Sequence, residues 1–148
     1  MSMKTDLTNA MKEAMRAKQK PRLGAIRLML AEVKRIEVDE RIVISDERLL
    51  AILDKMIKQR RDSVSQYQAA GRDELAAIET FEISVIQEFL PKALSDEEIN
   101  AMVIKAISES GAESMRDMGK VMAILKPKIQ GRADGGAVSG LVKIELNR

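Results

Sequence analysis

Apolar residues recur every three or four positions along almost the whole chain, the spacing that is typical of amphipathic helices. The first run predicts a helix whose buried face carries Met3, Leu7, Met11 and Met15. Pro21 suits the first position of a second helix, because its missing N–H would have no helical partner there. That helix is expected to end near Asp39 and to bury Ile26, Met29, Leu30, Val33 and Ile36.

A helical hairpin is predicted for the middle of the chain. Ser45 suits the N-cap of its first helix, and Gly71 can adopt the left-handed conformation that ends it. Asp73 is expected to cap the second helix and Pro91 to close it. Folding the chain back at Gly71 pairs positions whose numbers sum to about 142. The inward positions of the hairpin are then Leu49, Leu53, Met56, Ile57, Val64, Tyr67, Leu75, Ile78, Val85, Ile86 and Phe89.

A domain boundary is predicted just before the capping box at Ser95, so that the second domain begins at Leu94. Ser95 and Glu98 have the spacing of a capping box, in which each side chain accepts a hydrogen bond from the other residue's backbone N–H. The helix that they open is expected to run to Gly111. Its inward positions are Ile99, Met102, Val103, Ala106 and Ile107.

Two further helices complete the predicted tail. Ser114 with Asp117 is expected to cap the first of them in the same way. Because a proline lacks a backbone donor, this helix should stop at Lys126-Pro127. A loop over residues 128–136 then precedes a last helix from about Ala137. The apolar positions of the two helices are Met118, Val121, Met122, Leu125, Val138, Leu141, Val142 and Leu146.

The predicted fold is therefore all-α. Residues 1–93 form an N-terminal helical domain of about four helices that includes the long antiparallel hairpin, and residues 94–148 form a small three-helix tail domain. The one strand-like segment, Arg41 to Ile44, is too short and isolated to build a sheet. A chain of 148 residues can bury about two thirds of its unfolded surface, which suffices for this arrangement.

Composition excludes most familiar catalytic centres. The chain has no Cys and no His, so thiolate nucleophiles, cysteine zinc sites and the commonest general base are absent. We expect no catalytic residue, no metal and no cofactor. No apolar run approaches the roughly 18 residues of a membrane span, and the N-terminus lacks the apolar core of a signal peptide. These features predict a soluble protein of the cytoplasm, with no membrane partner.

Positive charge is concentrated in two stretches, although the net charge is only +2. Residues 1–35 contain nine basic and three acidic side chains, and residues 115–132 contain five basic and one acidic. In the first stretch, Arg27, Lys34 and Arg35 predict a basic strip on one helix. Such a strip either faces phosphate groups or is simply a solvated helix face.

The second stretch surrounds a glycine-rich loop, from Gly131 to Gly136, that precedes a helix. Its backbone amides, with Lys126, Lys128 and Arg132, could hold phosphate oxygens. Alternatively, the glycines only turn the chain and Lys126 complements the helix dipole. The spacing matches neither a P-loop nor a dinucleotide fingerprint.

Charged residues of the hairpin are interpreted as structural. Two carboxylates, Glu79 and Glu82, lie on one helical face opposite basic residues, and no nucleophile accompanies them. We expect an interhelical ion-pair network rather than acid–base catalysis. Its predicted members are Arg60, Arg61, Arg72, Glu79 and Glu82.

The sequence resembles the YqeY-like family over nearly its whole length. The residues that carry this resemblance are Arg60-Arg61-Asp62-Ser63, Ala70-Gly71-Arg72-Asp73-Glu74-Leu75, Glu79, Glu82-Ile83, Phe89-Leu90-Pro91 and Leu94-Ser95-Asp96-Glu97-Glu98. The segments Met118-Gly119-Lys120-Val121-Met122 and Gly131-Arg132-Ala133-Asp134-Gly135 also resemble the tail of the GatB subunit of tRNA-dependent amidotransferases. The resemblance implies a bacterial protein with a helical domain and a small helical tail.

In GatB that tail helps to hold tRNA, so the resemblance implies tRNA contacts at the matching positions. Together with the local charge, it gives the candidate RNA-binding set Gly119, Lys120, Lys126, Lys128, Gly131 and Arg132. The reactive domain of GatB has no counterpart here, so a label of carbon–nitrogen ligase with glutamine as amido-N-donor would be inherited by homology. The chain is not expected to be an enzyme on its own.

The leading hypothesis is a non-catalytic accessory module that binds tRNA or is associated with it. Only three aromatic residues are present, so we expect recognition through backbone and folded shape, without DNA sequence readout. The alternatives are a helical protein-interaction adaptor, with an exposed apolar strip on the first or the last helix, and an accessory subunit of a glutamine-dependent amidotransferase with a protein partner in tRNA-dependent amidation.

Overall fold

The computed structural model describes residues 2–148 and contains, within them, only helices and the turns that join them. The all-α fold class is thereby confirmed. The chain divides into two compact units, Met1–Pro91 and Lys92–Arg148, so Lys92 and Ala93 belong to the second unit. The first unit holds α1 (Met3–Arg16), α2 (Lys20–Glu40), α3 (Asp46–Ala69) and α4 (Asp73–Gln87). The second holds α5 (Asp96–Ser110), the 3-10 turn η1 (Met115–Asp117), α6 (Met118–Ile129) and α7 (Gly135–Leu146).

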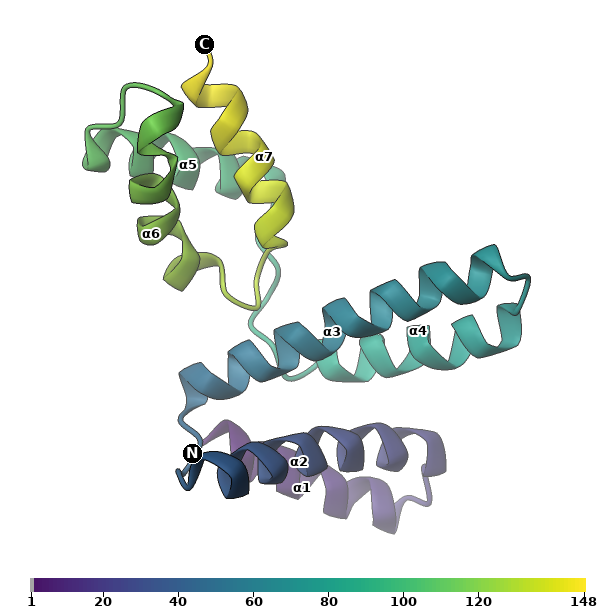
Figure 1. Cartoon of the computed structure of the whole chain (residues 1–148). Helices are drawn as coiled ribbons and strands as arrows, with labels where there is room; N and C mark the ends of the chain where they lie inside the picture. The colour runs from purple at the N-terminus through teal and green to yellow at the C-terminus, as the bar shows by residue number, and fades with distance from the viewer. Residues whose placement is uncertain (1) are drawn as a thin grey trace. The chain divides into compact units, whose positions relative to one another are not determined.

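The first unit consists of two helical hairpins that pack on each other (Figure 1). Helices α1 and α2 form one hairpin, and α3 and α4 form the other. The turn between α3 and α4 uses Gly71 in the left-handed conformation, with a φ of 71°. The side chains of Arg60 and Glu82, whose numbers sum to 142, meet across the hairpin at 3.1 Å.

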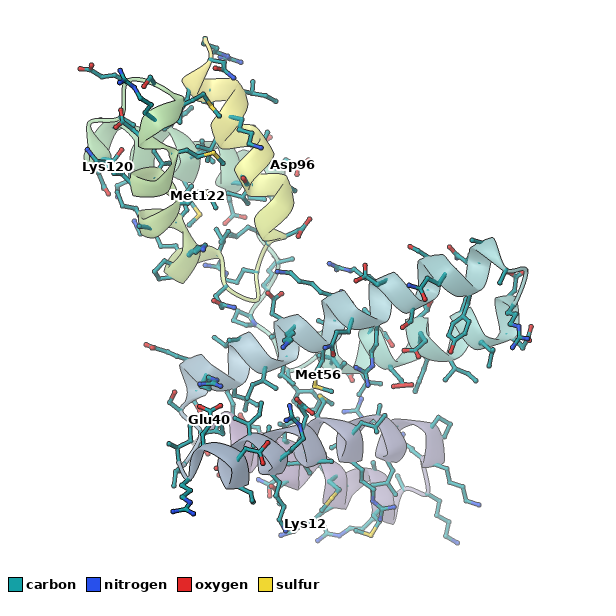
Figure 2. The ribbon with its side chains drawn as sticks, viewed as in Figure 1. Lys12, Glu40, Met56, Asp96, Lys120 and Met122 are labelled. Carbon is teal, nitrogen blue, oxygen red and sulfur yellow. The ribbon has the colours of Figure 1, made fainter. Side chains whose placement is uncertain are left out.

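The core of this unit lies between the two hairpins. Figure 2 shows Met56 pointing from α3 toward the α1–α2 pair. The fully or nearly fully buried side chains are Leu7, Ala14, Ala25, Ile26, Met29, Val33, Ile44, Leu49, Ile52, Leu53, Met56, Ile57, Val85 and Ile86. Removing each large aliphatic group from water contributes about 1.5–3 kcal/mol, so this cluster supplies most of the unit's stability.

Two positions predicted to be buried are exposed. Met15 is 46% exposed because Ala14 occupies the core position in the last turn of α1. Ile78 is 57% exposed although it lies seven residues, nearly two helical turns, before the buried Val85. Figure 1 shows the first turns of α4 projecting past the end of α2. The apolar stripe on α4 was predicted correctly, but Ile78 in its first half stays exposed at the wall of an open groove.

The helix starts follow local hydrogen bonding. Ser45 caps α3 by accepting a hydrogen bond from the backbone N–H of Arg48 at 3.2 Å, as predicted. Asp73 was expected to cap α4 but is its first residue, since Arg72 occupies the cap position without a side-chain hydrogen bond. An acidic residue in the first turn still interacts favourably with the helix dipole.

The second unit is a three-helix cluster with its own core. The predicted capping box is present: Ser95 accepts from the N–H of Glu98, and Glu98 accepts from the N–H of Ser95, both at 3.2 Å. Helix α5 ends at Gly111, whose φ is 70°. The buried side chains are Val103, Ala106, Val121, Leu125, Ile129, Val138, Val142 and Leu146, with Met122 partly buried beside them (Figure 2).

Helix α6 differs from its prediction at both ends. The predicted cap of Ser114 is wrong, because its side chain makes no cap hydrogen bond and the turn η1 precedes the helix. The carboxylate of Asp117 instead accepts from the N–H of Glu113 at 3.0 Å. The helix also continues past Pro127 to Ile129, which is buried in the core. Burying an isoleucine offsets most of the roughly 3 kcal/mol that an internal proline costs.

Candidate functional site

The glycine loop, from Gly131 to Gly136, is held by hydrogen bonds within its own unit. Gly131 has a φ of 72°, a conformation that favours glycine. The backbone oxygen of Arg132 accepts a hydrogen bond from the N–H of Leu94 at 2.9 Å. Its side-chain Nε donates to the backbone oxygen of Lys92 at 3.3 Å. Arg132 therefore fastens the segment before α5 to the loop, which is a structural role that the sequence did not indicate.

The N-terminus of α7 already carries a negative group. Asp134 is its N-cap, and one carboxylate oxygen accepts from the N–H of Gly136 at 3.3 Å. A phosphate at this position would meet the carboxylate at close range, and like charges repel. The geometry thus favours the interpretation of the loop as a turn and a helix cap over the interpretation as a phosphate cradle.

The basic residues of α6 do not share one face. Lys126 and Lys128 are exposed, but with about 100° of rotation per residue they point to nearly opposite flanks of the helix. Lys120 extends outward from the helix (Figure 2) and lies 3.8 Å from the carboxylate of Asp117. Gly119 is exposed beside it. The six candidate residues therefore belong to several surfaces of the second unit.

The predicted basic strip on α2 loses one of its three members, Arg35. Arg35 pairs with Glu32 at 2.6 Å and with Asp39 at 3.2 Å, so its charge is locally neutralised. Arg27 and Lys34 are exposed, lie seven residues apart on one helical face, and make no ion pair within residues 2–148.

A further residue extends this row. Arg41, which follows α2 directly, comes seven residues after Lys34, is exposed and has no acidic partner in the described part of the chain. The spacing was visible in the sequence, but Arg41 lay in the segment interpreted as strand-like. We call Arg27, Lys34 and Arg41 the α2 row. Arg27 and Lys34 lie about 10 Å apart along the helix axis, and Arg41 stands just past the end of the helix in the left-handed conformation, with a φ of 56°.

Four carboxylates have a pKa below the ordinary value, which favours their ionised form. A hydrogen bond from Arg35 lowers the pKa of Glu32. Hydrogen bonds from Lys4 and from the backbone of Ile44 lower the pKa of Glu37. For Glu98 and Asp117, backbone hydrogen bonds from Ser95 and Glu113 respectively are the main cause of a lowered pKa. A general acid needs the opposite shift, so these groups serve as caps and ion-pair partners.

In the hairpin, one arginine contacts both expected carboxylates. The Nε atom of Arg60 lies 3.1 Å from Glu82 and 3.9 Å from Glu79. Two other expected members, Arg61 and Arg72, are exposed and make no ion pair among residues 2–148. Arg61 is rotated by about 100° from Arg60 around α3, which takes its side chain away from α4.

An apolar groove lies between α2 and α4 in the first unit. Its volume is about 1170 Å³, and its walls include Pro21, Gly24 and Leu28 from α2 with Ile78 and Phe81 from α4. The exposed fractions of Leu28, Ile78 and Phe81 are 48%, 57% and 42%. The expected apolar strip was placed on the first or last helix, whereas this groove uses the second and fourth.

The comparison with protein families covers nearly the whole chain. A family model described as Yqey-like protein matches residues 4–146. The chain belongs to the YqeY-like family. In this YqeY-like chain, no helix of residues 2–148 is long and apolar enough to cross a membrane.

Three fungal relatives of this YqeY-like chain are each named altered inheritance of mitochondria protein 41, mitochondrial. The protein of Pyrenophora tritici-repentis is 30% identical over 125 residues, which are 83% of this chain and 68% of the relative. That of Vanderwaltozyma polyspora is 34% identical over 76% of this chain and 64% of its own length. That of Clavispora lusitaniae is 39% identical over 73% of this chain and 62% of its own length.

These relatives correct the expected location. Their names place them in mitochondria, so the prediction of a cytoplasmic protein is wrong. That prediction rested on the missing apolar core of a secretory signal, a feature that does not report on mitochondrial targeting, since transit peptides are amphipathic and rich in arginine. The relatives are fungal and therefore give the expectation of a bacterial protein no support.

Proposed function

We propose that this chain is a non-catalytic module that associates with RNA of the tRNA class through phosphate contacts. The observation that carries the proposal is the α2 row, in which Arg27, Lys34 and Arg41 are exposed, regularly spaced and free of acidic partners among residues 2–148. A phosphate contact contributes more binding free energy when the cation has no ion pair, because no existing contact with a carboxylate has to be broken first.

The rigidity of α2 supports this function. The helix is 21 residues long, and a neighbouring face, rotated by roughly 100° from the cations, is anchored in the core by Ile26, Met29 and Val33. Arg27 and Lys34 are therefore presented at a fixed separation of about 10 Å along the helix, with Arg41 just past its end, and only side-chain freedom is lost on binding. A fixed line of charge suits a folded RNA backbone better than a flexible single strand.

The second unit can add contacts. Lys126 and Lys128 are exposed at the end of α6, where Arg132 is engaged with the backbone of Lys92. The resemblance to an amidotransferase tail motivates the choice of tRNA. We therefore assign Lys126 and Lys128 a secondary role in phosphate contact, and the α2 row the main one.

The experiment is fluorescence anisotropy with total tRNA across a salt series. The test variant replaces Arg27, Lys34 and Arg41 by Gln. The matched control replaces Arg61, Arg72 and Lys143 by Gln, which removes the same charge from exposed positions elsewhere. Each phosphate contact contributes about 0.9 to the slope of log K against log salt, so loss of three should flatten the slope by about 2 to 3 units.

The control variant should keep the affinity and the slope close to those of the unmodified chain. Equal weakening in both variants would show that only net charge matters, which contradicts a role for the α2 row. Absence of binding to tRNA at low salt would contradict RNA association altogether.

The groove between α2 and α4 favours a second candidate function, that of a protein-interaction adaptor. An exposed apolar groove of this kind is typical of helix docking sites. The related hypothesis of an accessory subunit in a glutamine-dependent amidotransferase rests on the family resemblance, and the partner chains would have to supply every reactive group. Co-purification of such chains with this protein is its test.

A further inference from the structure

Two residues that carry a side chain adopt the left-handed backbone conformation, and both are cations next to α2. Lys18 lies just after α1 with a φ of 55°, and Arg41 follows α2 with a φ of 56°. No other residue except glycine has a positive φ in the described part of the chain. The conformation is unfavourable for a side chain because its Cβ approaches the following carbonyl oxygen. Each cation therefore occupies a position where folding alone favours glycine.

Other helix ends of the same chain use glycine for this conformation. After α1, the N–H of Gln19 donates to the backbone oxygen of Ala14 at 3.0 Å, the bond that closes a Schellman motif around Lys18. The corresponding bonds after α3 and α5 measure 2.8 Å and 3.3 Å, and there the left-handed residues are Gly71 and Gly111. The turn after α1 thus has no structural need for a lysine.

The helix dipoles do not explain lysine at positions 18 and 20. A cation is favourable after the last turn of a helix and unfavourable before or in the first turn. Lys18 lies between the end of α1 and the start of α2, so the two effects oppose each other. Lys20 is the first residue of α2, whose first turn has no acidic side chain and whose N-cap makes no side-chain hydrogen bond. The start of α2 is therefore more positive than its own stability favours.

The cations at this turn have no carboxylate partner. Residues 14–31 contain five basic and no acidic side chains. Arg22 is paired with Glu88 of α4. Arg16, Lys18 and Lys20 are exposed and make no ion pair among residues 2–148. We call these three residues the turn cluster.

The turn cluster continues the α2 row. Lys20 comes seven residues before Arg27, and Arg27 comes seven before Lys34, so the three lie on one face of α2 over about 21 Å. Lys18 precedes Lys20 by two residues, which limits the distance between their Cα atoms to about 7 Å. The exposed cations therefore form one surface that runs from the turn along α2.

We propose that the turn cluster of Arg16, Lys18 and Lys20 is part of the phosphate-binding surface for RNA, and that position 18 carries lysine for this contact although glycine would make the turn more stable. This inference rests on the proposed association with RNA and extends its site to the end of the α1–α2 hairpin. Residues that lower stability are found at functional sites, where another role outweighs their effect on folding.

The first test is Lys18→Gly, which removes the cation and supplies the residue that the other turns use. The melting temperature should stay the same or rise by up to about 4 °C, because the relieved strain exceeds the added entropy of the unfolded chain. The affinity for total tRNA should fall about eightfold at about 0.1 M salt, and the slope of log K against log salt should flatten by about 0.9. Lys18→Arg keeps the charge and should keep both the affinity and the slope.

Gly111→Lys is the reciprocal control. It places a lysine in the left-handed turn after α5, where an added Cβ would meet nothing within 4 Å. This variant should have a lower melting temperature and an unchanged affinity for tRNA. An increase in affinity as large as the decrease in Lys18→Gly would show that any added cation suffices, which overturns a specific role for the turn.

The outcomes separate this inference from the proposed function. Absence of tRNA binding by the unmodified chain, or binding only to vesicles of anionic phospholipid, refutes both. Binding that weakens when the α2 row is replaced by Gln but not in Lys18→Gly, Lys20→Gln refutes the turn cluster alone. If the surface is continuous, this double variant should flatten the salt slope by about 2 units, in addition to the change caused by the α2 row variant. A lower melting temperature for Lys18→Gly would show that lysine stabilises the turn and would overturn the proposal.

Discussion

A pair of substitutions in the second unit separates structural cations from binding cations. Arg132→Gln and Lys128→Gln each remove one positive charge from the same part of the sequence. Arg132 donates a hydrogen bond at 3.3 Å to the backbone of Lys92, whereas Lys128 is exposed and has no ion pair within the described residues. We therefore expect only the change at Arg132 to destabilise the second unit.

The size of the effect follows from the hydrogen bond. A charge-assisted hydrogen bond contributes about 1.5–3 kcal/mol when it is buried and well formed, and this one is partly exposed and long. We therefore expect this hydrogen bond to contribute about 1 kcal/mol to the stability of the second unit. That loss corresponds to a melting temperature lower by about 4–8 °C for a unit of this size. It also corresponds to amide exchange that is about fivefold faster where exchange occurs through opening of that unit.

The assay is hydrogen exchange of the backbone amides, combined with thermal melting by circular dichroism. The amide of Leu94, which donates to the backbone oxygen of Arg132, is the most informative probe. Exchange at Leu94 should accelerate in Arg132→Gln and stay unchanged in Lys128→Gln. Equal exchange rates in the two variants would refute the structural role of Arg132 and return it to the candidate phosphate contacts.

Three further outcomes are expected. Gly131→Ala should destabilise the second unit by about 1 kcal/mol in thermal melting, because its φ of 72° is unfavourable for a residue with a Cβ; an unchanged melting temperature would contradict this. Leu53→Ala, at a fully buried position, should cost about 2–5 kcal/mol in denaturant unfolding, whereas Ile144→Ala at an exposed position should cost less than about 0.5 kcal/mol. The pKa of Glu37 is lowered in the folded chain, so its stabilising contribution is present above its ordinary value of 4.5 and disappears as the pH falls through the lower folded value. Glu37→Gln should therefore flatten the acid side of the stability profile below about pH 5, and an unaltered profile would speak against the contact with Lys4.

Local signals predicted the fold well. Ser45, the Ser95–Glu98 capping box and the left-handed glycines at 71 and 111 are decided by hydrogen bonds and backbone conformation within a few residues, and each is present in the structure. The helical period of the apolar residues likewise predicted most of the two cores. These features are local or periodic, so the sequence contains them directly.

The errors arose where a distant element decides the outcome. Ile78 and Val85 lie on the same face of α4, seven residues apart, but only Val85 is buried by the rest of the unit. Pro127 should end α6, yet the buried Ile129 extends the helix by a further turn. Arg132 resembled a ligand contact because its partner, the backbone of Lys92, lies 40 residues away in the chain. None of these partners can be identified from a sequence window.

The basic residues of this protein can be divided into structural and binding groups only once their ion pairs are known. Arg35, Arg60 and Arg22 have carboxylate partners, while the α2 row retains its charge for an external group. On the same helix, Leu28 follows Arg27 and is rotated from it by about 100°, so the apolar groove and the α2 row occupy adjacent faces.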